Sequence, residues 1–511
     1  MTAQRSATGN GARQRLGVVD IGSNSIRLVV YDDLTRAPLP IVNRKAVIGL
    51  GTDVEKRGRI GEESFDQGVA AIAALVKIAE DVPVAQLALL ATAAVREAAN
   101  GEEFRAAVSA ACGHEMRVLS GDEEARMSAL GVASASPHAS GIVGDLGGGS
   151  LELIAIEDGK VLQQTSLPIG PLRLIERTEG RLEDASHAID AALSTVPWLE
   201  VMREREFYAV GGAWRAIARL HMGQHDYPLQ VIHGFHLQRR EARDFTAMLE
   251  HLGRQTTAQI RAVSRKRAEG LPWGAVILER VIAALAPSDI VFSAHGLREG
   301  FHFTALDETT RTEDPLLAAC RDLADQHRRF ADASSSLCAW LAPVAELLQD
   351  VSPRMVEALC LIADIGWQEH PEYRGEQAML RALRMPWSVL SHGERGFLGL
   401  ALFVRYGGSA GTATAATCRR LLGEDGAARA KALGKALRLA FELCAGRGGA
   451  LAHTPLSADG DGLTLTLLDE AAVAAPDKVE RYAASLSRAL GRPVRVAFPQ
   501  EARPQKKKAA G

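Results

Sequence analysis

The stretch that decides the fold reads Gly17-Val-Val-Asp20-Ile-Gly22-Ser-Asn-Ser25-Ile-Arg27-Leu-Val-Val-Tyr31, and it returns as Ile142-Val-Gly-Asp145-Leu-Gly147-Gly-Gly-Ser150-Leu-Glu152-Leu-Ile-Ala-Ile156. Each copy is an apolar run that ends in Asp, a turn of small residues and a second apolar run, a pattern that predicts a β-hairpin. Because a repeated unit of this kind indicates a duplicated architecture, we expect two similar lobes.

The tip of each hairpin has the composition of a phosphate site. Glycine lets the backbone approach phosphate oxygens closely, successive N–H groups bind anions, and a carboxylate suits a hard cation such as Mg²⁺. A hairpin that merely turns the chain would not require the same Asp-x-Gly-x-x-Ser frame in both copies. We therefore expect phosphate binding by the small residues of both tips, which are Gly22, Ser23, Asn24, Ser25, Gly147, Gly148, Gly149 and Ser150.

Composition narrows the class of protein. The chain has 511 residues, 47% of them hydrophobic and 24% charged, and no apolar run long enough to predict a membrane span. The polar stretch 1–15 lacks the apolar core of a signal peptide, so we expect a cytoplasmic location. A net charge of −3 argues against a surface built for nucleic acid, and six scattered cysteines without Cys-x-x-Cys spacing indicate neither a zinc site nor a disulfide framework. We expect neither a nucleic-acid nor a membrane partner.

Hydrophobic periodicity predicts the same order of elements twice. The first hairpin is followed by a strand (41–48), a helix that carries Val69 and Ile72 on one face, a strand (87–91), a helix (93–111), a strand (116–119) and a helix (122–134). After the second hairpin the order returns, with a long helical insertion before the last strand (290–293) and a helix from Leu297. This duplicated βββαβαβα layout is that of the actin, hexokinase and 70-kDa heat-shock superfold, which binds its ligand between the lobes.

The remaining chain changes character beyond Asp314-Pro315, where heptad-like apolar spacing without strands predicts an α-helical domain. The expected fold class is α/β, with two actin-like (ribonuclease H-like) lobes followed by an all-α domain and a small α+β module. The expected divisions are a disordered N-terminus (1–15), lobe I (16–135), lobe II (136–308), the α-helical domain (309–408), the α+β module (409–500) and a basic tail (501–511).

Five motifs in order carry a resemblance to a known family: Asp20-Ile-Gly-Ser-Asn-Ser-Ile-Arg27, Ala91-Thr-Ala-Ala-Val-Arg96-Glu-Ala, Ser120-Gly-Asp-Glu-Glu124-Ala-Arg, Asp145-Leu-Gly-Gly-Gly-Ser-Leu-Glu152 and Val210-Gly-Gly-Ala. Together they resemble the exopolyphosphatase / guanosine pentaphosphate phosphohydrolase (Ppx/GppA) family, in the long form with a C-terminal helical extension. The resemblance implies that Asp145 supports Mg²⁺, that Asp20 assists, that Arg96 contacts phosphate and that Glu124 activates the attacking water.

Alternatives remain open at several of these residues. Glu123 is the rival to Glu124, although Ser120-Gly-Asp-Glu123 also fits a capping box that would give Glu123 a structural role. Arg96 could instead be a surface arginine that pairs with Glu97 or Glu103. Glu152 stands where the first copy has Arg27, so either one side of the cleft holds metal and water through Glu152 while Arg27 holds phosphate, or the two side chains pair with each other.

Two further patterns bear on the ligand. Trp214 and Arg215 follow the turn Gly211-Gly212 and would crowd an adenine, which disfavours a nucleotide cofactor. In the helical domain, Ala363-Asp364 stands where the HD-like domain of the family has its metal-binding His-Asp pair, so we expect no catalytic metal there. That domain either packs and dimerises or guides substrate through a basic cluster on one predicted helix, which consists of Arg321, His327, Arg328 and Arg329. Another basic cluster, in lobe II, consists of Arg261, Arg265, Lys266 and Arg267.

The residues together favour a Mg²⁺-dependent exopolyphosphatase that acts on inorganic polyphosphate in the interlobe cleft, as a homodimer. Its expected catalytic residues are Glu124, Glu152 and Arg96, and its expected metal ligands are Asp145, Asp20 and Glu152. The first alternative is guanosine pentaphosphate phosphohydrolase, which requires the same chemistry and a guanosine site. An actin-like ATP-dependent kinase or binding module is the more distant alternative, although no Walker lysine motif is present.

Overall fold

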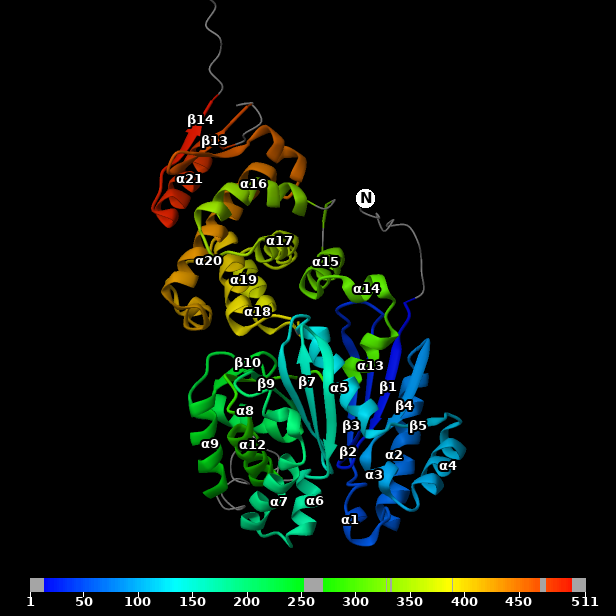
Figure 1. Cartoon of the computed structure of the whole chain (residues 1–511). Coiled ribbons are helices and arrows are strands. Elements are labelled where there is room, and N and C mark those ends of the chain that lie inside the picture. The colour runs from blue at the N-terminus through cyan, green and yellow to red at the C-terminus, as the bar shows by residue number, and fades with distance from the viewer. Residues whose placement is uncertain are drawn as a thin grey trace, which may run out of the picture. The chain divides into compact units, whose positions relative to one another are not determined.

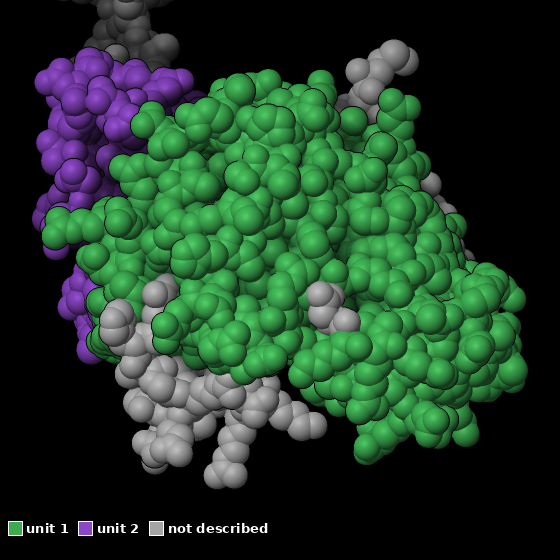
Figure 2. Space-filling view, turned by 60° about the horizontal axis from the view of Figure 1, so that its bottom comes forward, with its two compact units in different colours: residues 1–315 green, residues 316–511 purple. Residues whose placement is uncertain are grey.

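The computed structural model describes residues 13–251, 270–327, 329–330, 333–387, 389–468 and 475–498. The chain divides into two compact units, Met1–Pro315 and Leu316–Gly511, which Figure 2 colours green and purple. The expected disordered N-terminus, apart from residues 13–15, and the basic tail lie outside the described residues, and so do Arg328 and the basic cluster around Arg265.

The first lobe is built on a five-stranded sheet with the order β3-β2-β1-β4-β5. Strands β1 to β3 pair antiparallel, whereas β4 and β5 run parallel to β1. The strands are β1 (Leu16–Ile21), β2 (Ser25–Tyr31), β3 (Pro40–Val47), β4 (Gln86–Ala91) and β5 (Met116–Val118). The helices between them are α1 (Val54–Arg57), α2 (Glu62–Glu80), α3 (Ala93–Glu97) and α4 (Gly101–Cys112) (Figure 1).

The helix that periodicity predicted over 93–111 is two helices, α3 and α4. The chain turns to extended backbone at Ala98 (φ −74°, ψ 133°) because the side chain of Asn100 binds the backbone of a distant loop. Its amide oxygen accepts from the N–H of Ile60 at 2.8 Å, and its amide nitrogen donates to the carbonyl of Ile60 at 3.0 Å. Because Ile60 and Asn100 are 40 positions apart, these hydrogen bonds leave no trace in the local hydrophobic periodicity from which the helix was predicted.

The second lobe repeats the first and adds one strand. Its sheet has the order β10-β11-β9-β6-β7-β8, in which β8-β7-β6-β9-β11 matches β3-β2-β1-β4-β5 and β10 is the added edge. The strands are β6 (Gly141–Leu146), β7 (Leu151–Glu157), β8 (Lys160–Leu167), β9 (Glu206–Gly211), β10 (Phe235–Gln238) and β11 (Asp289–Phe292). The helices are α6 (Pro171–Arg177), α7 (Leu182–Ser194), α8 (Gly212–Gln224), α9 (Arg239–His251) and α12 (Leu271–Leu285). The predicted duplicated α/β fold is confirmed.

The two lobes exchange the last helix of each half of the chain. Ala129 of α5 (Gly121–Ala135), which ends the first half, is buried together with Ile154 of the second sheet. Conversely, Leu297 of α13 (Leu297–Ala305), from the second half, is buried together with Val18 of the first sheet. The expected boundary between lobes I and II, at residues 135 and 136, therefore separates the two halves of the sequence. It does not separate the two hydrophobic cores, because each half contributes its last helix to the other lobe.

Helices α5 and α13 pack closely because glycine stands at their contact. A Cβ on Gly300 of α13 would overlap the carbonyl oxygen of Met127 in α5, and a Cβ on Gly131 of α5 would overlap the carbonyl oxygen of Gly296. Only the absence of both side chains lets the two backbones meet. This close approach brings the N-terminal end of α13 beside the residues of α5 that face the cleft.

The second unit contains both of the C-terminal parts that the sequence separated. It begins one residue after Pro315, so α14 (Glu308–Thr312) belongs to the first unit instead of the helical domain. Its helix α20 packs against both α19 and α21, which leaves no division at residues 408 and 409. Its helices are α15 (Pro315–His327), α16 (Ser334–Leu347), α17 (Pro353–Leu361), α18 (Arg374–Arg384), α19 (His392–Arg405), α20 (Ala416–Cys444) and α21 (Pro476–Leu490).

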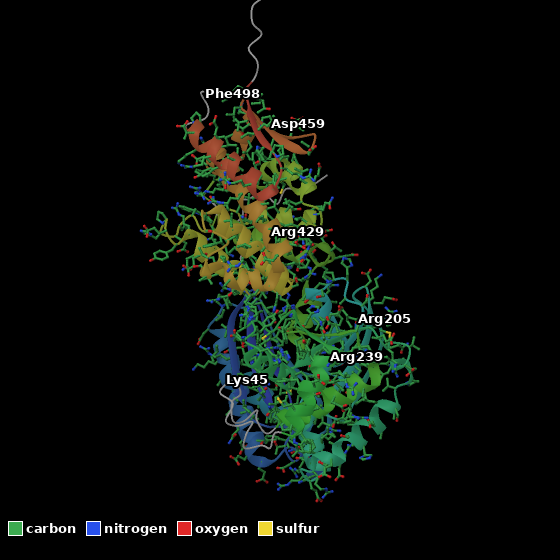
Figure 3. The ribbon with its side chains drawn as sticks, turned by 90° about the vertical axis from the view of Figure 1, so that its left-hand side faces the viewer. Lys45, Arg205, Arg239, Arg429, Asp459 and Phe498 are labelled. Carbon is green, nitrogen blue, oxygen red and sulfur yellow. The ribbon has the colours of Figure 1, made fainter. Side chains whose placement is uncertain are left out.

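A three-stranded sheet with the order β12-β13-β14 completes the second unit. It consists of β12 (Leu456–Asp459), which the sequence did not predict, β13 (Gly462–Thr466) and β14 (Val494–Ala497). Asp459, labelled in Figure 3, joins the two edge strands through the Arg495 guanidinium at 3.0 Å. Among the described residues, no helix combines the length and apolar character that crossing a membrane requires.

Candidate active site

The two hairpin tips are held in the same way. Each tip closes through one backbone hydrogen bond, from Gly22 N–H to the Ser25 carbonyl at 3.1 Å and from Gly147 N–H to the Ser150 carbonyl at 3.0 Å. The loop after each third strand then donates to the tip carbonyls. These bonds run from Gly51 to Ser23 (2.8 Å), from Gly49 to Asn24 (3.1 Å), from Leu172 to Gly148 (2.9 Å) and from Gly170 to Gly149 (3.2 Å).

This arrangement leaves the N–H groups of both tips open to a ligand. In the described part of the chain, no protein acceptor takes the N–H of Ser23, Asn24, Gly148 or Gly149. The tips also face each other closely, because a Cβ on Gly148 would lie 3.2 Å from the Ser23 Cβ and one on Gly149 would lie 3.3 Å from the Ser23 Oγ. Two concavities of backbone donors can thus bind neighbouring phosphate oxygens.

The strand registers of the two copies agree. Asp20 pairs across the ladder with Arg27, and Asp145 pairs with Glu152. Arg27 does not pair with Glu152: its Nε donates to the Asn43 side chain at 2.8 Å, whereas the Glu152 carboxylate accepts from Ser166 Oγ at 2.9 Å. The alternative in which the two side chains pair with each other is therefore wrong, and separate roles for Arg27 and Glu152 stay a prediction.

Helix α5 separates the roles of its two glutamates. Glu123 forms the predicted capping box with Ser120: its carboxylate accepts from the Ser120 N–H at 2.9 Å, and its own N–H donates to the Ser120 Oγ at 3.1 Å. Glu124 is instead buried and accepts from Arg96 Nη1 at 3.0 Å. The same Arg96 nitrogen donates to the Leu119 carbonyl at 2.8 Å, so Arg96 is anchored beside Glu124. The alternative partner Glu97 lies farther away, with its Oε1 3.9 Å from Arg96 Nη2.

Burial raises the pKa values of four carboxyl groups in the candidate site. Burial raises the pKa of Glu124 to about 7, although Arg96 opposes the shift. Burial also raises the pKa of Glu152 well above its usual range, and the nearby Glu124 and Asp145 raise it further. The pKa values of Asp20 and Asp145 are raised by burial as well. Several carboxyl groups with raised pKa values in one place are typical of a catalytic site or a cation site.

Ser128 is a neighbour of Asp145 that the sequence did not identify. It lies one helical turn after Glu124, is fully buried, and donates its hydroxyl to Asp145 Oδ2. This hydrogen bond lowers the pKa of Asp145, against the larger effect of burial, which raises it.

We expect Ser128→Ala to destabilise the protein by about 1–3 kcal/mol at pH 8, because an ionised buried carboxylate loses a donor. This difference in the free energy of unfolding should be smaller at pH 4. Asp145 is then closer to protonated in both the folded and the unfolded state, so the Ser128 hydroxyl stabilises its ionised form less. Urea unfolding at both pH values measures this change. Thr246→Val is the control, because the buried Thr246 hydroxyl donates to the Ala242 carbonyl at 2.9 Å and its loss should not depend on pH. Equal deficits for Ser128→Ala at the two pH values would contradict the expectation.

Three charged residues that the sequence analysis did not assign to the site lie within it. Arg298 Nε lies 3.6 Å from Asp20 Oδ2, and Arg215 is close enough to Asp145 to oppose the rise of its pKa. Glu299 accepts from the Tyr31 hydroxyl at 2.9 Å and from the Gly296 N–H at 3.0 Å. Burial alone would raise the pKa of Glu299, but Arg298, His295 and backbone donors lower it to about 2. One pattern in the sequence could have indicated Arg298 and Glu299 as site residues. They begin a helix directly after an apolar strand, which is the position that Arg96 has after β4.

Trp214 does not lie in the cleft, so the argument that it would crowd an adenine was wrong. Its indole is fully buried in the second lobe, packs edge-on against Phe207, and donates to the Gly274 carbonyl at 3.0 Å. Neighbouring Arg215 points the other way, with its Nη1 donating to the Ala294 carbonyl at 3.1 Å. Adjacent residues on a helix face different directions, which a linear motif does not reveal.

Three arginines of the helical domain form ion pairs within it. Arg329 Nε donates to Asp364 Oδ2 at 2.7 Å, Arg405 Nη2 donates to Asp364 Oδ1 at 2.8 Å, and Arg321 pairs with Glu357 at 3.1 Å. Asp364, the acidic half of the sequence pair Ala363-Asp364, is thus the partner of two arginines. Because Arg321 and Arg329 already pair with carboxylates, they do not support the hypothesis that this domain guides substrate.

Magnesium fits the donor set at the tips in one specific way. No three or more His, Cys, Asp or Glu side chains of the described chain are grouped as a metal site. Mg²⁺, however, is usually held by one or two carboxylates together with water and substrate phosphate oxygens. Burial raises the pKa of Asp20, nearby Asp145 raises it further, and both aspartates present oxygen, so these two residues suit such a cation.

The duplicated lobes and the facing tips define a protein of the actin-like fold with a candidate phosphate site, and comparisons with known proteins identify its family. A family described as Ppx/GppA phosphatase matches residues 28–309, and one described as the C-terminal part of exopolyphosphatase matches residues 324–497. The chain belongs to the Ppx/GppA phosphatase family, whose members hydrolyse phosphoanhydride bonds.

Individual relatives cover much of the chain at modest identity. Retrograde regulation protein 2 of Saccharomyces cerevisiae is 27% identical over 438 residues, which cover 78% of this chain and 74% of that protein. Exopolyphosphatase 1 of Mycobacterium leprae is 29% identical over 330 residues, covering 61% and 95%. A crystal structure of an exopolyphosphatase from Cytophaga hutchinsonii shares the fold, with a TM-score of 0.53 and 24% identity over 57% of this chain and 97% of that one.

Proposed function

We propose that the chain is an exopolyphosphatase that releases the terminal phosphate of inorganic polyphosphate by Mg²⁺-assisted attack of water. The observation that carries the proposal is the pair of facing tips, in which the N–H groups of Ser23, Asn24, Gly148 and Gly149 have no protein acceptor within the described residues. A linear chain of phosphates suits two adjacent anion cradles better than a single phosphate group does. The relatives named exopolyphosphatase, and the match of residues 324–497, support polyphosphate as the substrate class.

The residues of the site can then act as follows. The tip N–H groups bind the terminal phosphoryl oxygens, and the guanidinium groups of Arg96, Arg27 and Arg298 offset the negative charge that surrounds them. Ionised Glu124 accepts a proton from the water that attacks phosphorus, while the bond to the bridging oxygen of the remaining chain breaks. Arg96 holds Glu124 in place through the 3.0 Å hydrogen bond.

Asp20 and Asp145 would hold Mg²⁺, with Glu152 as a third candidate ligand. When bound, the cation would offset charge on the phosphate oxygens. The Glu152 carboxylate is held by Ser166 at 2.9 Å and is fully buried, so without a cation its raised pKa favours the neutral acid.

We expect purified protein to release phosphate from long polyphosphate without added nucleotide, and to lose that activity when EDTA removes Mg²⁺. A side-by-side assay with long polyphosphate, tripolyphosphate, guanosine pentaphosphate and ATP, each with and without Mg²⁺, measures this preference. Faster turnover of guanosine pentaphosphate would replace the proposal with its first alternative. Strict dependence on ATP would indicate a kinase, and binding without turnover would indicate a regulator, the role that the name of the Saccharomyces cerevisiae relative describes.

A further inference from the structure

Glu97 lies between two arginines that come from different lobes. One carboxylate oxygen, Oε2, accepts from Nη2 of Arg173 on α6 of the second lobe. The other, Oε1, lies 3.9 Å from Nη2 of Arg96, its neighbour on α3 of the first lobe. The Arg173 side chain is only 14% exposed and the Glu97 side chain 35%, so this pair is partly shielded from solvent.

A second contact joins the same two lobes beside this pair. Glu176, three residues after Arg173 and thus on the same side of α6, accepts from the N–H of Asp53 at 2.7 Å. Its other oxygen is buried and has no hydrogen-bond partner among the described residues. Helices α6 and α1 are in contact here, at the lower end of the first unit in Figure 1. The pocket next to these contacts is lined by both tips, through Ser23 and Gly149, and by Glu97 and Arg173.

Arg96 has two carboxylates within reach, and only one of them serves the reaction. Its Nη1 donates to Glu124 at 3.0 Å, whereas Glu97 stands at the longer distance of 3.9 Å. A carboxylate without a partner would attract the nearest guanidinium. Arg173 already binds the other oxygen of Glu97. Glu97 therefore competes only weakly for Arg96, which keeps its hydrogen bond to Glu124.

We propose that Arg173 is a positioning residue: by holding Glu97 across the lobe boundary, it keeps Arg96 on Glu124 and completes the site when the lobes are together. The inference deepens the proposed function and rests on it, since it concerns the placement of the Arg96 and Glu124 pair. It also implies that separation of the lobes would release Glu97 toward Arg96 and disturb the site.

The test compares Arg173→Met, Glu97→Gln and the double variant in turnover of polyphosphate. Arg173→Met should lower kcat about tenfold or more and also weaken substrate binding, because Glu97 then draws Arg96 away from Glu124 and from the phosphate, and small misplacements in a site cost up to about a hundredfold. Glu97→Gln should stay within about threefold of the unchanged protein. The double variant should recover to the level of Glu97→Gln, because the competitor is gone.

Other outcomes overturn the proposal. Equal loss in Arg173→Met and in the double variant, with a raised KM, would make Arg173 a direct phosphate ligand. Equal loss in both single variants without recovery would reduce the pair to a structural contact. Arg280→Met is the matched control, because Arg280 also forms an ion pair, with Asp190 at 2.7 Å, elsewhere on the second lobe. It should leave kcat unchanged.

The same proteins separate this inference from the proposed function. If the unchanged protein turns over none of the four substrates, the proposed function fails. The competition is then read from binding of tripolyphosphate, which Arg173→Met should weaken and the added Glu97→Gln should restore. Binding that does not change among the variants would overturn the positioning role independently of catalysis.

Discussion

Glu124→Gln is expected to lower kcat by about 10²–10⁴-fold while leaving polyphosphate affinity within a few-fold of the unchanged protein. The amide keeps the shape of the side chain and a contact to Arg96, but it cannot accept a proton from water. Because the proposed phosphate ligands are the tip N–H groups and arginines, binding should survive. Steady-state phosphate release together with isothermal titration of tripolyphosphate separates kcat from affinity.

Glu123→Gln provides the matched control one residue earlier on the same helix. Glu123 closes the capping box with Ser120, so its replacement should cost up to about 1 kcal/mol of stability and little turnover. Activity of Glu124→Gln within a few-fold of the unchanged protein would transfer the role of base to Glu123 or to another residue.

The pH profile gives the same prediction an independent measurement. Burial raises the pKa of Glu124 to about 7, so the ionised base is lost as the pH falls through that value. The kcat of the unchanged protein should therefore fall toward low pH with a midpoint near 7. The residual activity of Glu124→Gln should lack this limb, and persistence of the limb would assign it to a different group.

Gly300→Ala should destabilise the first unit by about 1–3 kcal/mol or more and lower kcat at least tenfold. A Cβ on Gly300 would overlap the carbonyl oxygen of Met127, so α5 and α13 must move apart. Since α5 carries Glu124 and α13 carries Arg298, their separation displaces both sides of the site. Thermal unfolding and phosphate release measure the two effects.

Gly223→Ala is the control for helical glycine in the same unit. A Cβ at Gly223, in α8, would meet nothing within 4 Å, so the better helix propensity of alanine should stabilise the protein by up to about 1 kcal/mol. The two substitutions should thus have opposite signs. A stabilising Gly300→Ala would show that the two helices can separate without cost.

Local sequence patterns were sufficient for the duplicated fold and for much of the site. The alternation around Asp20 and Asp145 predicted both hairpins, and the repeated frame predicted that their tips would act as a pair. The spacing Ser120-Gly-Asp-Glu123 predicted the cap, which the structure confirms, and so made Glu124 the candidate base. These features depend on residues within a few positions of each other, whose backbone geometry local propensity largely determines.

The duplicated Asp-x-Gly-x-x-Ser hairpin, the order of elements and the carboxylate of Glu124 were thus legible from the amino acids alone, because each is encoded within one strand, turn or helix. Only the tertiary structure revealed that α5 and α13 exchange lobes, that Arg298 and Arg215 join the site, and that Arg173 reaches Glu97 from the opposite lobe. Those contacts join residues far apart in the chain. They depend on how closely two helices can pack at Gly131 and Gly300, and no periodic pattern along the sequence records that distance.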